Sequence, residues 1–332
     1  MARRAAGGGE FALIEALRRR AGEPGPPWSV GIGDDAAVLR PRTGHDLVWT
    51  ADALVEDVHF RWATSDAASL GAKCLAASLS DLAAMGASPL GCLLSLAVPS
   101  DRDPRLPGFW RGLLAAARRS GCPLVGGDTV RAPSWLLSLS ALGQVPRGRA
   151  LRRAGAKPGD RILVTGWLGA SALGLALLER GVEGEPGASS FVRRHQRPEP
   201  PWQAGARLLR TGHATAAIDV SDGLGQDLGH LLRESGVAAD LELERLPLAR
   251  GALGLCERHG LDPLALAYGG GEDYELLFCV RKTAPEAALF SKRLRCPVAE
   301  IGRIRRGRGL QLTRGGRAVA APSGGFEHFK RP

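Results

Sequence analysis

The longest apolar stretch of the chain is residues 74–100, in which Asp81 is the single charged side chain. Before Pro89 the residues are small and apolar enough to predict a largely buried helix over residues 66–85, and residues 90–98 predict a buried strand. An ionised carboxylate in such surroundings is costly unless a cation meets it, and the nearest basic residue along the chain is Lys73. Asp81 therefore either faces solvent at a helix end or binds a metal ion.

Strands and helices alternate in both halves of the chain, which predicts an α/β (α+β) fold built from sandwiches. The pattern predicts helices at residues 10–20, 106–119, 170–180 and 224–232, and strands at residues 122–125, 135–145, 161–165, 214–220 and 237–243. Residues 181–201 are expected to be irregular. The basic stretch 146–160 is rich in Gly and Pro and predicts the boundary between a domain of residues 1–147 and one of residues 148–332.

Two short apolar runs near the N-terminus, residues 36–40 and 47–51, predict a hairpin that places Asp35 and Asp52 side by side. Two adjacent carboxylates repel each other unless a cation lies between them. Residues 31–36 also fit the dinucleotide pattern G-x-G-x-x-A, but that motif requires a helix after it, and here a strand is expected. Ordinary acidic turn residues are the alternative interpretation.

Composition limits the class of protein. The chain has 332 residues, 44% of them apolar, and a net charge of +10. Much of the basic excess lies near the two ends, and no aromatic-basic interleaving accompanies it, so we expect anionic small molecules rather than nucleic acid as partners. Six cysteines without a C-x-x-C pair indicate reduced core residues. No signal peptide or membrane span is expected, and the predicted location is cytoplasmic.

Acidic residues recur where strands are predicted to end, at Asp34/Asp35, Asp52, Asp81, Asp128 and Asp219/Asp222. Carboxylates are the hard oxygen ligands that suit Mg²⁺, which commonly accompanies phosphates. Gly126 and Gly127 follow a predicted strand directly, so the backbone there can approach a phosphate. The sequence has no Walker A motif. This set favours phosphoryl transfer without a P-loop.

In the order and the residues of these motifs the chain resembles the thiamine-monophosphate kinase family, within the superfamily of aminoimidazole ribonucleotide synthetase. The similar stretches, in the order in which they occur, are GIGDDAAVL (31–39), TADALVEDVHF (50–60), SLSDLAAMGASP (78–89), GGDTVR (126–131), GRALRRAGAKPGD (148–160), AIDVSDGL (217–224) and GGEDYEL (270–276).

The resemblance implies an N-terminal mixed-sheet domain that binds ATP and forms a homodimer, and a C-terminal α/β domain that completes the substrate site. It implies direct transfer of the γ-phosphoryl group of ATP to thiamine monophosphate, with several Mg²⁺ ions, no phosphoenzyme and no general base. The implied metal positions are Asp35, Thr50, Ala51, Asp52, Asp81, Asp128, Asp219 and Asp222. The implied ATP contacts are Gly127, Asp128, Arg153 and Ser221, and the implied substrate contacts are His59, Glu272 and Phe326.

One departure concerns Ala51, where relatives often carry Thr. A backbone carbonyl would serve as a ligand equally well with Ala, whereas a missing hydroxyl would weaken one ion. Two alternative functions stay open at this point. One is another ATP-dependent member of the superfamily, such as an aminoimidazole ribonucleotide synthetase or a selenophosphate synthetase. The other is a non-catalytic nucleotide- or RNA-binding protein, which the net charge suggests and the many acids argue against.

Overall fold

The computed structural model describes residues 10–322, with side chains from residue 13 onward, and these residues form two compact units. The first unit comprises the chain up to residue 82 together with residues 89–147. The second comprises residues 83–88 and the chain from residue 148. Within the described range no helix combines the length and the apolar character needed to cross a bilayer.

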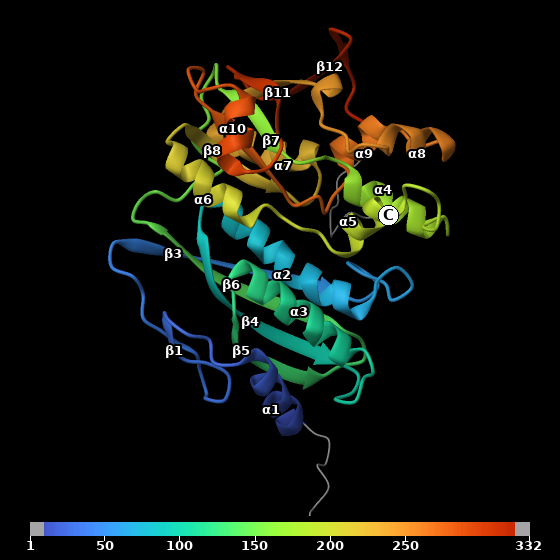
Figure 1. The fold of residues 1–332 in the computed structure, drawn as a ribbon. Helices are drawn as coiled ribbons and strands as arrows, with labels where there is room; N and C mark the ends of the chain where they lie inside the picture. Colours follow the sequence, from blue (N-terminus) through green and yellow to red (C-terminus); the bar gives the residue numbers. More distant parts are fainter. Residues whose placement is uncertain (1–9, 323–332) are drawn as a thin grey trace, which may run out of the picture. The chain divides into compact units, whose positions relative to one another are not determined.

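The first unit is built on a four-stranded sheet with the order β3-β6-β4-β5 (Figure 1). β3 and β6 pair antiparallel whereas β4 and β5 pair parallel, so the sheet is mixed as expected. The elements of this sheet and the helices of the unit are β3 (His45–Val55), β6 (Leu136–Pro146), β4 (Ser88–Val98), β5 (Leu124–Arg131), α1 (Glu10–Ala21), α2 (Ala67–Ala84) and α3 (Leu106–Ser120).

Helix α2 confirms the prediction of a largely buried helix before Pro89. Leu75 and Leu82 have no exposed surface, and even Lys73 is only 2% exposed. The small residues between them let the helix bury almost its whole circumference, since Ala and Ser side chains demand little space. Asp81 is only partly exposed, close to the C-terminal end of this helix.

The predicted hairpin of residues 36–40 with residues 47–51 is wrong. A short strand, β2 (Val38–Leu39), pairs instead with β1 (Trp28–Val30), and β3 pairs with β6 along its whole length. Both β3 and β6 have 11 residues and alternate in burial, so they satisfy far more backbone hydrogen bonds with each other than a two-residue strand would offer. The register therefore does not place Asp35 opposite Asp52.

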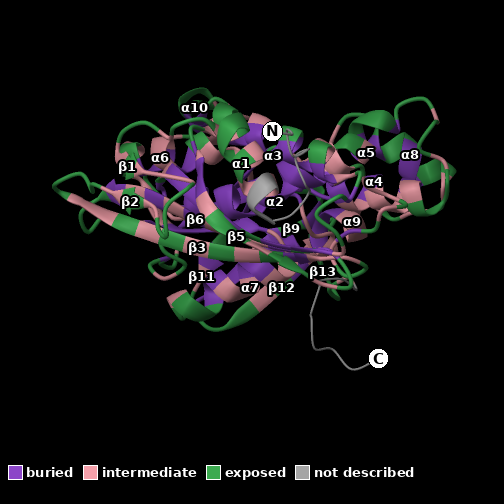
Figure 2. Ribbon diagram, turned by 90° about the horizontal axis from the view of Figure 1, so that it is seen from below, coloured by how far each residue is buried: buried purple, intermediate pink, exposed green. Residues whose placement is uncertain are grey.

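The two faces of the first sheet differ. In β3 the residues whose side chains point to the same side as Asp52 face helix α2, and the alternate residues are exposed (Figure 2). Trp49 is 73% exposed on that second face, which we call the open face. Large apolar side chains occur on every strand of the open face, namely Leu47, Trp49, Leu93, Val130 and Leu136.

The second unit contains a seven-stranded sheet with the order β13-β12-β9-β11-β7-β10-β8. Only β12 and β9 pair parallel among the pairings described. Its strands are β7 (Arg161–Thr165), β8 (Ala214–Val220), β9 (Ala238–Glu242), β10 (Glu275–Val280), β11 (Val298–Arg305), β12 (Gly309–Arg314) and β13 (Arg317–Val319). Its helices are α4 (Ala170–Glu179), α5 (Ser189–Gln196), α6 (Trp202–Thr211), α7 (Leu224–Ser235), the 3₁₀ helix η1 (Leu243–Arg245), α8 (Ala252–Arg258), α9 (Pro263–Gly269) and α10 (Ala287–Leu294).

Helices cover both faces of this second sheet. Leu277 belongs to the same buried cluster as Leu228 of α7. The next residue, Phe278, points the other way, and its ring centre lies 5.8 Å from that of Phe290 in α10. Every residue of β10 is buried, as a central strand between two helical layers requires. The expected α/β sandwich is confirmed.

Residues 181–201 are not irregular throughout, because α5 lies among them. This helix has a strongly polar sequence, and its buried residues are Phe191 and His195. Phe191 packs into a cluster with Leu173 and Leu177 of α4. Packing against a neighbouring helix thus stabilises a segment whose own sequence signal is weak.

Candidate active site

A cavity of about 1290 Å³ lies within the first unit. Its wall combines the loop of residues 31–37, which joins β1 to β2, with residues 126–129 of β5. Asp35 and Asp128 therefore line the same cavity, together with the indole rings of Trp28 and Trp49. Acidic groups beside flat apolar rings suit a ligand with an aromatic ring and a metal-bound polar group.

A positively charged side chain, that of Arg18, also lines this cavity. Helix α1 brings the guanidinium group of Arg18 against Gly33, and Arg18 lines the cavity wall. The basic run 18–20 gives no sign in the sequence of what lies beside Arg18. Arg18 thus places one positive charge next to the loop that carries Asp34 and Asp35.

The packing of β5 against β4 requires a glycine at position 127, whether or not a ligand is bound. The pair Gly126-Gly127 lies inside strand β5 rather than after it, opposite Leu93 and Leu94 of β4. A Cβ atom on Gly127 would collide with the carbonyl oxygen of Leu94. Asp128, the next residue, is exposed, and its Oδ1 accepts a hydrogen bond of 2.9 Å from the Thr129 N–H. The glycine therefore lets β5 approach β4 and so fixes where Asp128 lies.

A second pair of acids, Asp52 in β3 and Asp81 in α2, lies between the sheet and the helix. The Thr50 hydroxyl donates to Asp81 Oδ2, and the Ser78 hydroxyl donates to Asp52 Oδ2 at 2.5 Å. Burial and, secondly, the charge of Asp81 raise the pKa of Asp52 to about 6, against the opposing effect of the Ser78 hydrogen bond. The two carboxylates therefore lie close enough for the charge of Asp81 to act on the ionisation of Asp52.

Ala51 faces away from this pair. It is exposed on the open face, whereas its neighbours Thr50 and Asp52 both point towards α2. A side-chain hydroxyl at this position would therefore point to the opposite side of the sheet from Asp52 and Asp81.

His59 follows β3 in a tight turn. Its ring Nδ1 accepts a hydrogen bond of 3.1 Å from the Val55 N–H, and the backbone N–H of His59 donates to the Val55 carbonyl. Because Nδ1 is an acceptor, the neutral ring carries its proton on Nε2.

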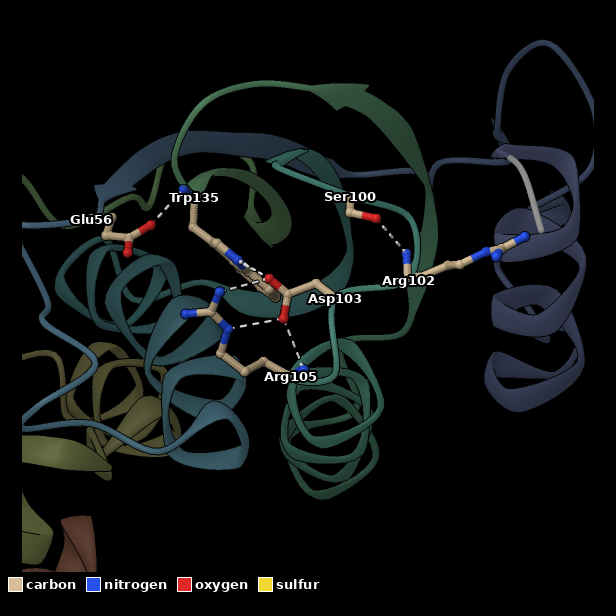
Figure 3. A network of polar contacts seen from close by, with 6 residues as sticks. All are labelled: Glu56, Ser100, Arg102, Asp103, Arg105 and Trp135. Carbon is tan, nitrogen blue, oxygen red and sulfur yellow. Dashed lines mark hydrogen bonds and ion pairs between the residues drawn. The ribbon is translucent and has the colours of Figure 1, made fainter.

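A polar network that sequence analysis missed holds the same turn (Figure 3). Glu56 accepts a hydrogen bond of 2.8 Å from the Trp135 N–H, and the Trp135 indole donates to Asp103 at 3.0 Å. Arg105 binds Asp103 through Nε and Nη2, at 2.9 and 2.7 Å, and stacks on Trp62. Burial raises the pKa of Asp103, but the hydrogen bonds from Arg105 and Trp135 outweigh it and lower the pKa below its usual value. The network ties the loop that carries His59 to α3 and β6.

In the second unit, the acids after β8 meet the predicted glycine-rich segment. The Glu272 N–H donates to the Ser221 carbonyl at 2.7 Å, and the Tyr274 N–H donates to the Val220 carbonyl at 2.8 Å. Glu272 and Tyr274 have φ values of 63° and 51°, which are rare for residues with a side chain. Strained backbone is therefore held where Glu272 and Ser221 come together.

Asp227 organises the turn that carries Ser221 and Asp222, and sequence analysis missed it. Its Oδ2 accepts the N–H groups of Ser221, Asp222 and Gly223 at 3.0, 3.1 and 3.1 Å. Burial and, secondly, the charge of Asp222 raise the pKa of Asp227 to about 7, although the three hydrogen bonds act in the opposite direction. The sequence feature that could have revealed this role is an acidic residue in the first turn of a predicted helix, where carboxylates bind exposed N–H groups.

The remaining predicted contacts are placed as follows. Asp219 is 5% exposed at the end of β8, and Asp222 accepts a hydrogen bond of 3.2 Å from Gln226. Arg153 is exposed, and its charge, after burial and that of Arg233, lowers the pKa of His230 in α7. Phe326 lies outside the described residues, and its role stays a prediction.

His195 contacts Glu272 from α5. Its Nδ1 lies 3.3 Å from Glu272 Oε2 and 3.2 Å from the Ser171 hydroxyl, and the ring is 5% exposed. An ionised carboxylate only accepts hydrogen bonds, so the contact with Glu272 needs a proton on Nδ1.

We expect His195→Asn, whose amide nitrogen can replace Nδ1, to keep the Michaelis constant for the substrate that Glu272 is predicted to contact within about threefold. His195→Gln places its amide nearer to Nε2 and should raise that constant by about tenfold, with little change in kcat. Steady-state kinetics with each substrate varied in turn would test this. Equal Michaelis constants for the two variants would show that the ring has a packing role alone.

The acids do not form one compact metal site. In the part of the chain that the structure describes, no group of three or more His, Cys, Asp or Glu side chains is close enough to hold an ion. The structure instead gives three smaller sets: Asp34, Asp35 and Asp128 around the cavity, Asp52 with Asp81, and Asp219 with Asp222 and Glu272 in the second unit.

Comparison with known proteins gives a consistent result for both units. Residues 33–145 match the AIR synthase related protein N-terminal domain, and residues 157–315 match the corresponding C-terminal domain. The thiamine-monophosphate kinase of Salmonella typhimurium is 40% identical over 98% of this chain and 99% of its own.

Solved structures show the same similarity. The crystal structure of thiamine-monophosphate kinase from Stenotrophomonas maltophilia has a TM-score of 0.83 and 41% identity, and the match covers 93% of this chain and 98% of that one. A complex of AaThiL with AMPPCP and TMP has a TM-score of 0.76 and 31% identity, over 99% of both chains. Identity at this level over almost the whole length shows that the chain belongs to the thiamine-monophosphate kinase family.

Proposed function

We propose that this protein transfers the γ-phosphoryl group of ATP directly to thiamine monophosphate, which yields ADP and thiamine diphosphate. Membership of the family supports the reaction, and the complex of its relative with AMPPCP and TMP supports the two substrates. The acceptor phosphate is already an anionic nucleophile, so no general base is required. The protein's tasks are to position two phosphates and to neutralise their charge.

The observation that carries the proposal is the Asp52–Asp81 pair. Two partly buried carboxylates, of which Asp52 has a raised pKa, form a site that a hard divalent cation would stabilise, and the neighbouring hydroxyl oxygens of Thr50 and Ser78 complete a set of oxygen donors. These residues therefore fit Mg²⁺. When bound, Mg²⁺ would neutralise phosphate charge. We assign the further metal positions to Asp35, Asp128, Asp219, Asp222 and the carbonyl group of Ala51.

We assign the nucleotide to the cavity of the first unit. Gly127 and Asp128 form part of its wall, and the indole ring of Trp28 offers surface for a base. Arg153 and Ser221 of the second unit are further proposed ATP contacts. His59, Glu272 and Phe326 are the proposed contacts for thiamine monophosphate. The proposed domain limits are residues 1–147 and 148–332.

A coupled assay tests the proposed function. With ATP, Mg²⁺ and thiamine monophosphate we expect ADP and thiamine diphosphate in equal amounts, and no turnover when Mg²⁺ is removed with EDTA. Phosphorylated purine precursors run in parallel provide the comparison. Turnover with a purine precursor and none with thiamine monophosphate would assign the chain to a sister family within the superfamily.

We also propose that the open face of the first sheet is a homodimer interface. Its exposed side chains include Trp49 at 73% and Val130 at 50%, and large apolar side chains gathered on one face usually mark an interaction surface. An identical face on a second copy can pair with it around a twofold axis.

Trp49→Glu should therefore convert a dimer into a monomer, because it buries two unpaired charges at the interface. Light scattering after size-exclusion chromatography measures this directly. The matched control is Leu253→Glu, which changes an exposed leucine of the second unit and should leave the dimer intact. A wild-type protein that is monomeric at micromolar concentration would contradict the proposal.

A further inference from the structure

A second cavity, of about 400 Å³, lies within the second unit and is lined by three arginines. Arg149 and Arg152 come from the segment that leads into this unit, and Arg281 follows β10. Leu209 of α6 and Thr215 of β8 complete the wall. The volume falls at the lower end of the range of about 300–1,000 Å³ that is usual for small-molecule sites.

The three guanidinium groups lack partners inside the described part of the chain. All three arginines are exposed, no hydrogen bond or ion pair of their side chains occurs among residues 13–322, and no Asp or Glu lines the cavity. Other arginines of the same unit do find acids; Arg161, for example, lies 3.2 Å from Glu300. Three positive charges therefore surround one cavity whose lining carries no acidic side chain.

Asp160 contacts the lining residue Thr215 but does not itself line the cavity. Asp160 Oδ2 accepts the hydroxyl of Thr215 at 2.7 Å and the N–H of Lys157 at 2.9 Å. Thr215 thus directs its proton towards Asp160, and the carboxylate is 5% exposed. The hydrogen bonds of Asp160 therefore hold Thr215 in the cavity wall and go to Thr215 and Lys157 rather than to the three guanidinium groups.

This cavity is separate from the proposed ATP contacts of the same unit. Arg153 directly follows Arg152 but does not line the cavity. Its charge acts instead on His230 of α7, and Asp222 acts on the same ring.

We propose that the cavity of Arg149, Arg152 and Arg281 binds a small diphosphate or polyphosphate anion without a metal ion. Planar guanidinium groups bind phosphoryl oxygens through paired hydrogen bonds, and three of them match the charge of a diphosphate group near neutral pH. The site is additional to the proposed phosphoryl-transfer site. There the acids would repel a phosphate unless Mg²⁺ were present, whereas the arginine cavity needs none.

Titration calorimetry of the full chain with inorganic diphosphate, in buffer that contains EDTA, tests the proposal. Binding should be detectable at low salt and should weaken steeply as NaCl is raised, because ion pairs are screened. The triple variant Arg149→Gln, Arg152→Gln, Arg281→Gln should weaken binding by at least about tenfold. The control Arg250→Gln, Arg306→Gln, Arg308→Gln removes the same charge from exposed positions of the same unit and should change binding by less than twofold.

The source of the anion is distinguished by repeating the titration with ADP and with thiamine diphosphate. Tighter binding of either than of inorganic diphosphate, lost in the triple variant, would identify an organic diphosphate as the ligand. The single variant Arg281→Gln should show a partial loss and guards against misfolding of the triple variant. An absence of binding to the wild-type protein, or an equal loss in the control variant, would overturn the proposal. Failure of the kinase assay would leave these binding results unaffected.

Discussion

Replacement of Asp81 with Asn is expected to lower turnover about a hundredfold or more while the protein stays folded. The carboxylate is proposed to neutralise Mg²⁺ at the point where two phosphates meet, and loss of one charge-stabilising group typically costs two to three orders of magnitude. Asn keeps an oxygen that accepts the Thr50 hydroxyl, so the local packing should survive. Steady-state rates at several Mg²⁺ concentrations, compared with the exposed control Asp101→Asn, measure the effect.

The same substitution should not destabilise the metal-free protein. In the folded state the pKa of Asp52 is raised from 3.8 to about 6, so its ionisation opposes folding; this penalty is absent below pH 3.8 and complete above pH 6. The charge of Asp81 is the second cause of that shift. Its removal should raise the free energy of unfolding by about 1 kcal/mol at pH 8 and leave it unchanged at pH 4. Urea unfolding in EDTA at the two pH values checks the sign. Wild-type turnover at low Mg²⁺, or a large loss of stability at pH 8, would show that Asp81 has a different role.

Replacement of Asp227 with Ala should reduce both stability and activity. Three N–H groups would lose their acceptor, and each buried donor left without one costs about 1–3 kcal/mol when water cannot replace the bond. We expect a loss of about 3 kcal/mol in the free energy of unfolding and a drop of tenfold or more in kcat/KM for ATP, because Ser221 and Asp222 lie in the turn that these bonds hold.

Asp227→Asn should behave in the opposite way. Asn keeps an acceptor oxygen but cannot ionise. Ionisation of Asp227, whose pKa is about 7 in the folded protein against 3.8 in the unfolded chain, weakens the fold as the pH rises. The stability advantage of the variant over wild type should therefore grow as the pH rises from 3.8 to about 7 and stay constant above that. Asp262→Ala, which removes the exposed N-cap of α9, serves as a control and should cost about 1 kcal/mol without affecting kcat/KM. Similar behaviour of the Ala and Asn variants at Asp227 would contradict this explanation.

The sequence predicts elements better than it predicts partners. The apolar stretch around Asp81 correctly predicts α2 and β4, because a long run of small apolar residues has few other solutions. The partner of β3 was predicted wrongly, since residues close in sequence suggested a hairpin, whereas β6 lies about ninety residues away in register. Strand pairing over such a distance depends on the whole sheet, and local pattern carries little information about it.

The candidate site shows the same limit. Acids at turns were visible as a set, but nothing in the sequence indicated that Asp52 pairs with Asp81 while Asp35 shares a cavity with Asp128. The supporting residues His195, Asp103 and Asp227 were missed because each acts through contacts with distant segments. A buried histidine in a polar helix offers no local pattern that could reveal its partner.

The path of the chain between its two units restricts how this gene can recombine. Residues 83–88 belong to the second unit although the chain on either side of them belongs to the first. The Leu151 N–H donates to the Met85 carbonyl at 3.0 Å, and a Cβ on Gly205 of α6 would collide with the carbonyl of Ala83. A gene fragment that begins at residue 148 would lack these partners. Exchange of one half between relatives by a single crossover should therefore yield poorly folded chimaeras unless the short segment is exchanged with it.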